Sequence, residues 1–301
     1  MQRFDEYVAE ALYGADGFYT SGRGIAGRRG GDFITSPEVG PLFGALVAEW
    51  VNRVWEQRGR PASFAVFDVG TGPGTLLRSL AAAEPECAQA WTLQGIDLAT
   101  ASELPGSLEG AVVIANELLD NVPFRWVRSS REDGEDGEEA FVANGAIAWR
   151  PFKGPLLAEG EYPLVEGAAA LVQSVLDREP AGVLVFDYGA ATTAELARRG
   201  GWLRCYREHQ RSNDPLRNPG WWDITTDVPL DQLPFPAKTW TQAEFCAELG
   251  IEALVAEGRA YWRHHAAKPD LSAVRMRSRV SEAEALTDPT GLGAFWVAEW
   301  S

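Results

Sequence analysis

Short apolar runs that end beside an acidic or amide residue recur along the chain, and stretches with helical spacing separate them. Residues 64–69, 91–96, 111–116 and 182–187 each form such a run, whereas residues 75–83 have the composition of a helix. Buried strands that alternate with helices are typical of a doubly wound α/β sheet with parallel strands. The pattern therefore predicts that fold class and places the polar residues at the carboxyl ends of the strands.

Helical patterns precede the first strand. Apolar residues at helical spacing predict one helix over residues 2–13 and a second over about 36–58. The tripeptide Ser36-Pro-Glu has the order of an N-cap, a first-turn proline and a first-turn acid. We therefore expect an N-terminal helical extension over residues 1–60 and an α/β domain over residues 61–301.

Two segments interrupt the alternation of strands and helices. Alternating residues within about 124–164 predict a small inserted antiparallel region, and the acids of residues 131–139 suit its solvated hairpin tip. Residues 190–236 are rich in Arg, Pro, Asn and Trp, which predicts a long functional loop or lid. The remaining pattern predicts helices over residues 164–178, 242–249 and 271–286 and a last strand over 293–298.

The most specific chemical signal is a glycine turn after the first predicted strand. Asp68 is followed by Gly70, Gly72 and Gly74, and Thr75 stands where a dinucleotide fingerprint has its third glycine. Glycine adopts positive φ and lets the backbone approach a ligand closely. An acid followed by alternating glycines is typical of S-adenosylmethionine (SAM) enzymes, although the turn also suits a pyrophosphate cofactor.

A second acid, Asp97, follows the second predicted strand, where a carboxylate commonly binds the ribose hydroxyls of a nucleotide cofactor. Carboxylate oxygens accept hydrogen bonds and therefore pair well with two vicinal hydroxyls. The structural alternative is an aspartate that caps the next helix. The residues that we expect to bind the cofactor are Asp68, Gly70, Thr71, Gly72, Gly74, Asp97 and Asn116.

Composition narrows the set of partners. The chain has 27 Lys and Arg against 43 Asp and Glu, a formal charge of −16 and a pI near 4.7. Because nucleic acids require positive charge against their phosphates, we expect no DNA or RNA partner, and a basic protein partner fits better. The three cysteines and three histidines lack metal-ligand spacing, so we expect neither a metal nor a disulfide framework. No signal peptide or membrane span is indicated, which favours a cytoplasmic location without a membrane partner; the oligomeric state stays open.

Together these segments resemble the MidA family of SAM-dependent methyltransferases. The resemblance rests on residues 31–38, 68–76, 114–123 and 186–189, which keep the family's order. It implies a class I SAM-methyltransferase sheet of seven strands, with a helical part at the N-terminus and an inserted substrate region. Mitochondrial members assist the assembly of respiratory complex I, and a characterised one methylates an arginine of a complex I subunit. The implied substrate is therefore a protein side chain, with arginine favoured.

The chain departs from the family's pattern after Asp97. Only thirteen residues, 98–110, precede the next strand, where the family has a helix, a strand and a loop. We therefore expect the third strand of the class I sheet to be truncated or missing. Since the end of that strand normally helps to hold adenine, we also expect weakened cofactor binding.

Acidic residues supply the catalytic candidates. Methyl transfer from a sulfonium needs no metal, and the enzyme contributes mainly orientation. A guanidinium stays charged, and carboxylates bind it bidentately. Glu117 and Asp120 are therefore the leading candidates, with Asp32 and Glu38 supplied by the N-terminal region. The structural alternatives are a capped helical turn for Glu117 and Asp120 and a loop turn for Asp32.

Three classes of function are compatible with these patterns. The first is a SAM-dependent methyltransferase that acts on a protein side chain. The second is a catalytically weak assembly or scaffold protein that keeps the fold, which the short link after Asp97 favours. The third is a nicotinamide oxidoreductase, which Thr75 disfavours. Asp187 and Tyr188 suit either a substrate contact or the end of a buried strand.

Overall fold

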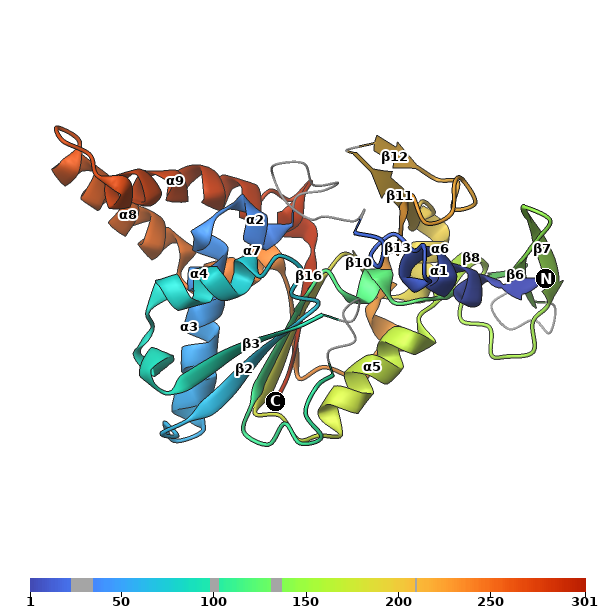
Figure 1. The fold of residues 1–301 in the computed structure, drawn as a ribbon, viewed down its shortest axis with the longest axis horizontal. Helices are drawn as coiled ribbons and strands as arrows, with labels where there is room; N and C mark the ends of the chain where they lie inside the picture. The colour runs from blue at the N-terminus through green and yellow to red at the C-terminus, as the bar shows by residue number, and fades with distance from the viewer. Residues whose placement is uncertain (23–34, 98–102, 131–136, 209) are drawn as a thin grey trace.

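The computed structural model describes residues 1–22, 35–97, 103–130, 137–208 and 210–301. Its centre is a six-stranded sheet with the order β15-β16-β9-β4-β2-β3 (Figure 1). Strands β9, β4, β2 and β3 are parallel, whereas β16 is antiparallel to both β9 and β15. The bounds are β2 Phe64–Val69, β3 Trp91–Ile96, β4 Val112–Asn116, β9 Gly182–Asp187, β15 Lys238–Thr241 and β16 Trp296–Trp300.

Successive side chains of the central strands enter two separate cores, because neighbouring residues of a strand face opposite sides of the sheet. In β2, Phe67 and Val69 belong to the core that includes α5 (Glu166–Leu176). Val66 belongs to the core that includes α3 (Pro41–Gln57) and α4 (Thr75–Ala83). Figure 1 shows α5 and the α3–α4 pair on opposite sides of the sheet, which confirms the predicted doubly wound architecture.

Strand β3 forms one edge of the sheet, and β2 is its sheet neighbour. In the part of the link that the structure describes, residues 103–111, no strand is added beyond β3. The segment instead returns toward α5: Leu108 donates its N–H to the carbonyl of Arg178 at 3.0 Å. The expected truncation of the third class I strand is therefore consistent with the observed strand order.

The helices of the N-terminal sixty residues are divided between two cores. Helix α1 (Phe4–Tyr13) packs with the inserted strands in one core, and α3 packs with the other face of the main sheet. The helix predicted over about 36–58 is divided at Gly40 into α2 (Ser36–Val39) and α3. Thr35, not Ser36, is the N-cap of α2, because the Ser36 hydroxyl donates to Gln242 Oε1 at 2.8 Å.

The inserted region is antiparallel, as predicted from its alternation. Its sheet has the order β1-β6-β5-β8, with β7 paired to β6. Glu139 forms an ion pair with Arg125 at 2.5 Å and Glu138 pairs with Arg128 at 2.7 Å, so these two acids belong to strand β6 and not to a hairpin tip. The bounds are β1 Gln2–Arg3, β5 Arg125–Ser129, β6 Gly137–Ala143, β7 Ala146–Pro151 and β8 Gly160–Leu164.

The segment 190–236 is folded, which corrects the expectation of a long loop or lid. It contains α6 (Thr193–Arg199) and a sheet with the order β12-β11-β13. Trp222 and Ile224 are buried in the same core as α1, so packing that the local composition does not reveal orders this segment. Its further strands are β10 Gly189–Ala190, β11 Leu203–Arg207, β12 Gln210–Ser212, β13 Asp223–Thr226 and β14 Val228–Pro229.

Three helices complete the α3 side of the molecule. The predicted capping box opens α7 (Gln242–Glu248): Glu244 accepts from the N–H of Thr241 at 2.7 Å and donates its own N–H to the Thr241 hydroxyl at 3.2 Å. Helices α8 (Ile251–His265) and α9 (Leu271–Leu286) form a hairpin that projects at one end (Figure 1). Across the described ranges, no helix has the length and apolarity that crossing a bilayer requires.

Candidate active site at the carboxyl edge of the sheet

The glycine turn after β2 lies where the strand order predicts a ligand site. Gly70, Gly72 and Gly74 have φ values of 76°, 48° and 72°, a region that L-residues with a side chain rarely adopt. The turn is fixed to the neighbouring strand, since the N–H groups of Gly70 and Thr71 donate to the carbonyl of Ile96 at 2.7 and 3.2 Å. The turn thus continues β2 across the end of β3.

Open space surrounds the middle of this turn. A Cβ atom built on Gly72 would meet no atom of the described residues within 4 Å, whereas one built on Gly70 would lie 2.9 Å from the Leu118 side chain. Both glycines are exposed, but a side chain would have room only at Gly72. Exposed backbone at a positive φ, followed directly by the first turn of α4, is a suitable cradle for a nucleotide-like ligand.

The Asp68 side chain is buried and contacts the glycine turn. It is 3% exposed, and its Oδ2 atom accepts a hydrogen bond from the Thr71 hydroxyl at 2.8 Å. Burial raises the pKa of Asp68 to about 7, although the Thr71 hydrogen bond opposes this shift. The observed contact of this predicted cofactor residue is thus with the turn itself, which Thr71 ties to both β2 and β3.

Asp97 and Asp120 both lie close enough to Tyr13 for their charges to affect it. Burial is the first cause of the raised pKa of Tyr13, and the charges of Asp223, Asp120 and Asp97 add to it. Asp97 follows the end of β3, and Asp120 belongs to the short 3-10 turn Leu119–Asn121 after β4. The structure therefore brings the predicted ribose-binding acid and a predicted catalytic acid to one side of the sheet edge.

Glu117 has a backbone conformation that side-chain-bearing residues seldom adopt. Its φ is 50°, and its N–H donates to the carbonyl of Phe186 in β9 at 2.8 Å. The Oε1 atom accepts from the Ser36 N–H at 3.3 Å and from Asn116 Nδ2 at 3.2 Å. A left-handed residue costs free energy, and such conformations concentrate at functional sites. The turn at Glu117 directs the chain away from the sheet at the point where β4 and β9 end.

Asp187 is the residue that caps the turn after β4. Its Oδ2 atom accepts from the N–H groups of Leu119 and Asp120 at 2.9 and 3.2 Å, and its Oδ1 atom accepts from the Tyr188 N–H at 2.9 Å. Because Asp187 is fully buried, we assign these hydrogen bonds a structural role. The capping role that the sequence left open for Glu117 and Asp120 belongs to Asp187.

Only one carboxyl oxygen of Asp120 has a hydrogen-bond partner among the described residues. The Tyr188 hydroxyl donates to Asp120 Oδ2, whereas Asp120 Oδ1 is buried without a hydrogen-bond partner among the described residues. Arg204 covers the Tyr188 ring, with its guanidinium carbon 4.3 Å from the ring centroid, and forms an ion pair with Asp227. Asn116 Oδ1 is a second buried acceptor without a partner in this part of the chain.

Burial shifts the acids of this cluster toward their protonated forms. It raises the pKa of Glu117 to about 8, with the charge of Asp120 as the second cause. It also raises the pKa of Asp120, an effect that the Tyr188 hydrogen bond and the charge of Arg204 oppose. Perturbed pKa values in a concave polar region are typical of sites that bind charge or transfer protons. A cationic group would find at least two carboxyl groups here.

The N-terminal region is attached to the same turn. The hydroxyl of Tyr19 donates to Asn121 Oδ1 at 3.0 Å and that of Tyr13 donates to the Asn121 carbonyl at 3.1 Å. The N–H of Ser36 reaches Glu117, as described above. Glu38 lies in α2, half-buried and within two residues of that contact. Asp32, the fourth catalytic candidate, lies outside the described residues.

Several residues that surround these acids could not be predicted from the sequence. Asn121 Nδ2 donates to Asp223 Oδ1 at 2.8 Å, a contact between residues 102 positions apart. Arg204 comes from the segment predicted to be a loop. Tyr188 was visible only as the residue after a buried strand. Nothing in the local pattern distinguishes these residues from other polar positions, because their partners are distant in the chain.

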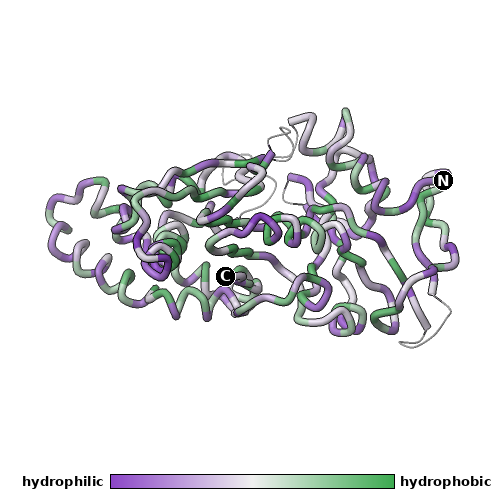
Figure 2. Tube along the Cα trace, turned by 90° about the horizontal axis from the view of Figure 1, so that it is seen from below, coloured by the Kyte–Doolittle hydropathy of each residue, from purple (hydrophilic) through white to green (hydrophobic). Residues whose placement is uncertain are grey.

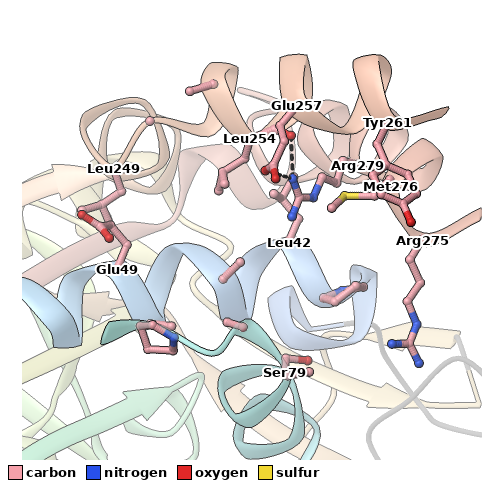
Figure 3. A pocket seen from close by; sticks show the side chains of 18 of the residues that line it. Leu42, Glu49, Ser79, Leu249, Leu254, Glu257, Tyr261, Arg275, Met276 and Arg279 are labelled. Carbon is pink, nitrogen blue, oxygen red and sulfur yellow. Dashed lines mark hydrogen bonds and ion pairs between the residues drawn. The ribbon is translucent and has the colours of Figure 1, made fainter. Parts of the chain in front are cut away.

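A large groove lies elsewhere on the molecule. It has a volume of about 740 Å³ and separates α3 and α4 from the α8–α9 hairpin (Figure 3). An ion pair between Glu257 and Arg279 at 2.7 Å stands on its hairpin side. No residue of the glycine turn or of the Glu117–Asp120 turn lines it. We therefore take the sheet edge, and not this groove, as the candidate active site.

Comparisons with known proteins give this geometry a context. A family profile described as "Putative S-adenosyl-L-methionine-dependent methyltransferase" matches residues 157–246. The mitochondrial protein arginine methyltransferase NDUFAF7 homolog of Drosophila melanogaster is 24% identical over 354 residues, which cover 96% of this chain and 78% of that protein. The NDUFAF7 protein of Bos taurus is 42% identical over 73 residues, which cover 24% of this chain and 16% of that protein.

A solved structure shares the fold. It is a "likely methyl transferase from Burkholderia thailandensis bound to S-adenosyl-homocysteine", with a TM-score of 0.79, 24% identity and coverage of 99% of this chain and 87% of that one. The chain is similar to SAM-dependent methyltransferases, as the matched profile and these relatives show. These matches support SAM as the cofactor and methyl transfer as the reaction class, so the nicotinamide alternative is set aside.

The residues at the sheet edge fit SAM. The space above Gly72 admits a ligand against the backbone, and Asp97 supplies a carboxylate at the end of β3. Asn116, at the end of β4, adds an acceptor without a partner. These residues are our predicted SAM contacts, and the structure places all of them along one edge of four parallel strands.

Proposed function

We propose that this chain methylates a protein side chain and that arginine is the favoured acceptor. The observation that carries the proposal is the turn after β4, where Glu117 and Asp120 bring two carboxyl groups to the edge that carries the glycine turn. The buried Asp120 Oδ1 atom has no partner in the described structure and therefore suits an N–H donor from a substrate. The names of the relatives from Drosophila and cattle, both protein arginine methyltransferases, support the same acceptor.

The chemistry of a guanidinium matches these acids. When bound, SAM supplies an electrophilic methyl group on a sulfonium. A guanidinium is positively charged and donates several N–H groups in one plane, so a pair of carboxylates can hold it and orient one nitrogen. Methylation of that nitrogen releases a proton. Glu117 is the better acceptor for this proton, because its pKa of about 8 exceeds that of an ordinary carboxyl group.

These pKa values also indicate when Glu117 is protonated and when it is ionised. Without substrate, Glu117 is mostly protonated at neutral pH because burial disfavours its charge. A guanidinium that binds beside it favours the ionised form and lowers its pKa. The ionised Glu117 can then take the proton that the methylated nitrogen loses. Asp120, held by Tyr188, keeps its orientation throughout.

The test measures where a labelled methyl group goes. Purified protein is incubated with methyl-labelled SAM and an arginine-containing protein extract, and the proteins are hydrolysed and analysed for methylated amino acids. We expect methylarginine, and we expect Glu117→Gln to reduce its formation on the order of 10²-fold or more while SAM affinity stays near wild type. Glu84→Gln is the matched control, since Glu84 is an exposed glutamate that also has a positive φ. Label on lysine or glutamine alone would refute arginine as the acceptor.

A scaffold function is the second candidate, because the edge position of β3 leaves the adenine side of the site without a further strand among the described residues. Calorimetric titration with SAM and with NAD separates the candidates. SAM binding with turnover supports the enzyme, whereas absence of both would support the scaffold. A cytoplasmic location remains part of this proposal, and the protein's location in cells would test it.

A further inference from the structure

The outer part of the α8–α9 hairpin, residues 258–280, is basic although the protein is acidic. Residues 258–280 contain six Lys and Arg and one acid, Asp270, while the whole chain has a formal charge of −16. The hairpin projects at one end of the molecule (Figure 1). Figure 2 shows hydrophilic and hydrophobic residues interspersed along it. The six basic residues are Arg259, Arg263, Lys268, Arg275, Arg277 and Arg279.

Three of these arginines line a groove on the hairpin. The groove has a volume of about 510 Å³ and is formed by α8 and α9 alone, on residues different from those of the groove in Figure 3. Arg277 lies over Trp262, with 4.9 Å between the guanidinium carbon and the ring centroid. The lining residues are Ala256, Arg259, Trp262, Arg263, Arg277 and Val280. We call this set the hairpin groove.

Nearby acids do not neutralise the hairpin groove. Glu257 pairs with Arg279 and lines the other groove, and Asp270 caps α9 by accepting from the Ala273 N–H at 2.7 Å. Glu252 and Glu284 lie one helical turn beyond Ala256 and Val280, exposed and outside the lining. Within the described chain, the three arginines of the hairpin groove form no ion pair. Their positive charge is therefore available to a partner.

We propose that the hairpin groove is a docking surface for an acidic segment of a protein partner. Arginine and tryptophan are enriched among the residues that dominate protein interfaces, and carboxylates pair bidentately with arginine. Trp262, Ala256 and Val280 provide an apolar floor between the charges. A segment that alternates acidic with apolar side chains matches this combination in both charge and polarity.

Charge favours a protein segment over an extended polyanion. DNA and RNA carry closely spaced phosphates and bind by neutralising many of them, whereas the hairpin groove offers three arginines. A long polyanion would also meet the acidic remainder of the chain. A membrane surface is flat, and the arginines and Trp262 line a concave groove instead. A short acidic segment can enter the groove without approaching the rest of the protein.

The experiment uses a defined acidic peptide as the probe. It is a labelled 20-residue amphipathic helix of Glu and Leu that contains neither arginine nor lysine, so its binding does not depend on the proposed methyl transfer. Fluorescence anisotropy measures its affinity for the full chain at low and at raised salt. We expect the affinity for the peptide to fall as the salt concentration rises. We also expect the triple variant R259E/R263E/R277E to bind the peptide about tenfold or more weakly than the wild type.

Matched variants isolate the position of the charge. The control triple variant R150E/R198E/R211E changes the charge by the same amount at exposed arginines far from the hairpin in the chain, and we expect it to retain wild-type affinity within about twofold. The milder R259Q/R263Q/R277Q variant keeps the test valid if charge reversal disturbs folding, which circular dichroism would show. A peptide with Gln in place of Glu should not bind.

Several outcomes would overturn the proposal. They are no binding by the wild type, equal loss in both triple variants, and equal binding of the Glu and Gln peptides. Tighter binding of a 20-nucleotide single-stranded DNA, or of vesicles with anionic lipids, would assign the hairpin groove to a different class of partner. A dimer by light scattering that dissociates in R259E/R263E/R277E would assign it to a second copy of this chain.

Discussion

The hydroxyl of Tyr188 donates to one oxygen of Asp120, and the other oxygen of the same carboxyl group is buried without a partner in the described structure. Tyr188 follows β9 and Asp120 follows β4, so two adjacent strands position one carboxyl group from both sides. Such an arrangement leaves a single acceptor atom for a substrate. Tyr188 is therefore a positioning residue for Asp120.

Replacing Tyr188 with phenylalanine tests this relationship. We expect Tyr188→Phe to lower methyl transfer about 10-fold or more, because a hydrogen bond to a charged group contributes about 1.5–3 kcal/mol. SAM affinity, measured calorimetrically, should stay unchanged. Tyr206→Phe is the control, since the half-buried Tyr206 makes no hydrogen bond to Asp120 in the described structure. Equal effects of the two substitutions would show that Tyr188 has only a packing role.

The buried position of Glu117 predicts a specific dependence of stability on pH. Its pKa is about 8 in the folded chain against an ordinary 4.5, so the folded state holds this proton more tightly. The stability that this proton provides is complete below about pH 4.5 and is lost as the pH rises through about 8. Glu117→Gln has no such proton to lose.

We therefore expect the melting temperature of Glu117→Gln to rise relative to wild type between pH 6 and pH 9. The corresponding change in the free energy of unfolding is on the order of 1–3 kcal/mol. Thermal denaturation of both proteins across this range measures it, with Glu84→Gln as the control. A difference between mutant and wild type that is constant with pH would contradict the raised pKa.

A side chain at Gly72 should block the cofactor and leave the fold intact. The φ of Gly72 disfavours valine, and its Cβ would enter the open space that we assign to SAM. Gly72→Val should show no calorimetric binding at SAM concentrations that saturate the wild type. Gly59→Val is the matched control, because Gly59 also has a positive φ and open surroundings but precedes β2. Wild-type affinity in Gly72→Val would place the cofactor elsewhere.

Cofactor binding should depend strongly on Asp97. With β3 at the sheet edge, part of the adenine face loses its cover, and about 60 Å² of apolar contact corresponds to roughly 1.5 kcal/mol, or about tenfold in affinity. The ribose contact at Asp97 then provides a larger share of the binding. We expect Asp97→Ala to abolish measurable SAM binding, and Glu103→Ala, an exposed acid in the same link, to leave it unchanged. Low-micromolar binding by both variants would disprove this account.

Much of the fold follows from local patterns. Apolar runs between helical stretches predicted β2, β4 and β9, because a strand buried on both faces must be apolar at nearly every position, whereas the edge strand β3 is half-exposed. The glycine turn could also be predicted, since three positive φ values occur within five positions and residues other than glycine rarely adopt a positive φ. The short link after Asp97 predicted the shortened sheet for a similar reason: thirteen residues leave little room for a helix and a strand.

Only the tertiary structure decided which acids share a site and what each one contacts. The sequence predicted Glu117 and Asp120 as a pair, but it gave no sign that Asp187 caps their turn or that Tyr188 orients Asp120. It also assigned α1 and α3 to one extension and residues 190–236 to a loop, whereas α1 and β13 pack together. The physical reason is the same in each case. Local propensity depends on neighbours in the chain, whereas burial and hydrogen bonding here join residues between 67 and 208 positions apart.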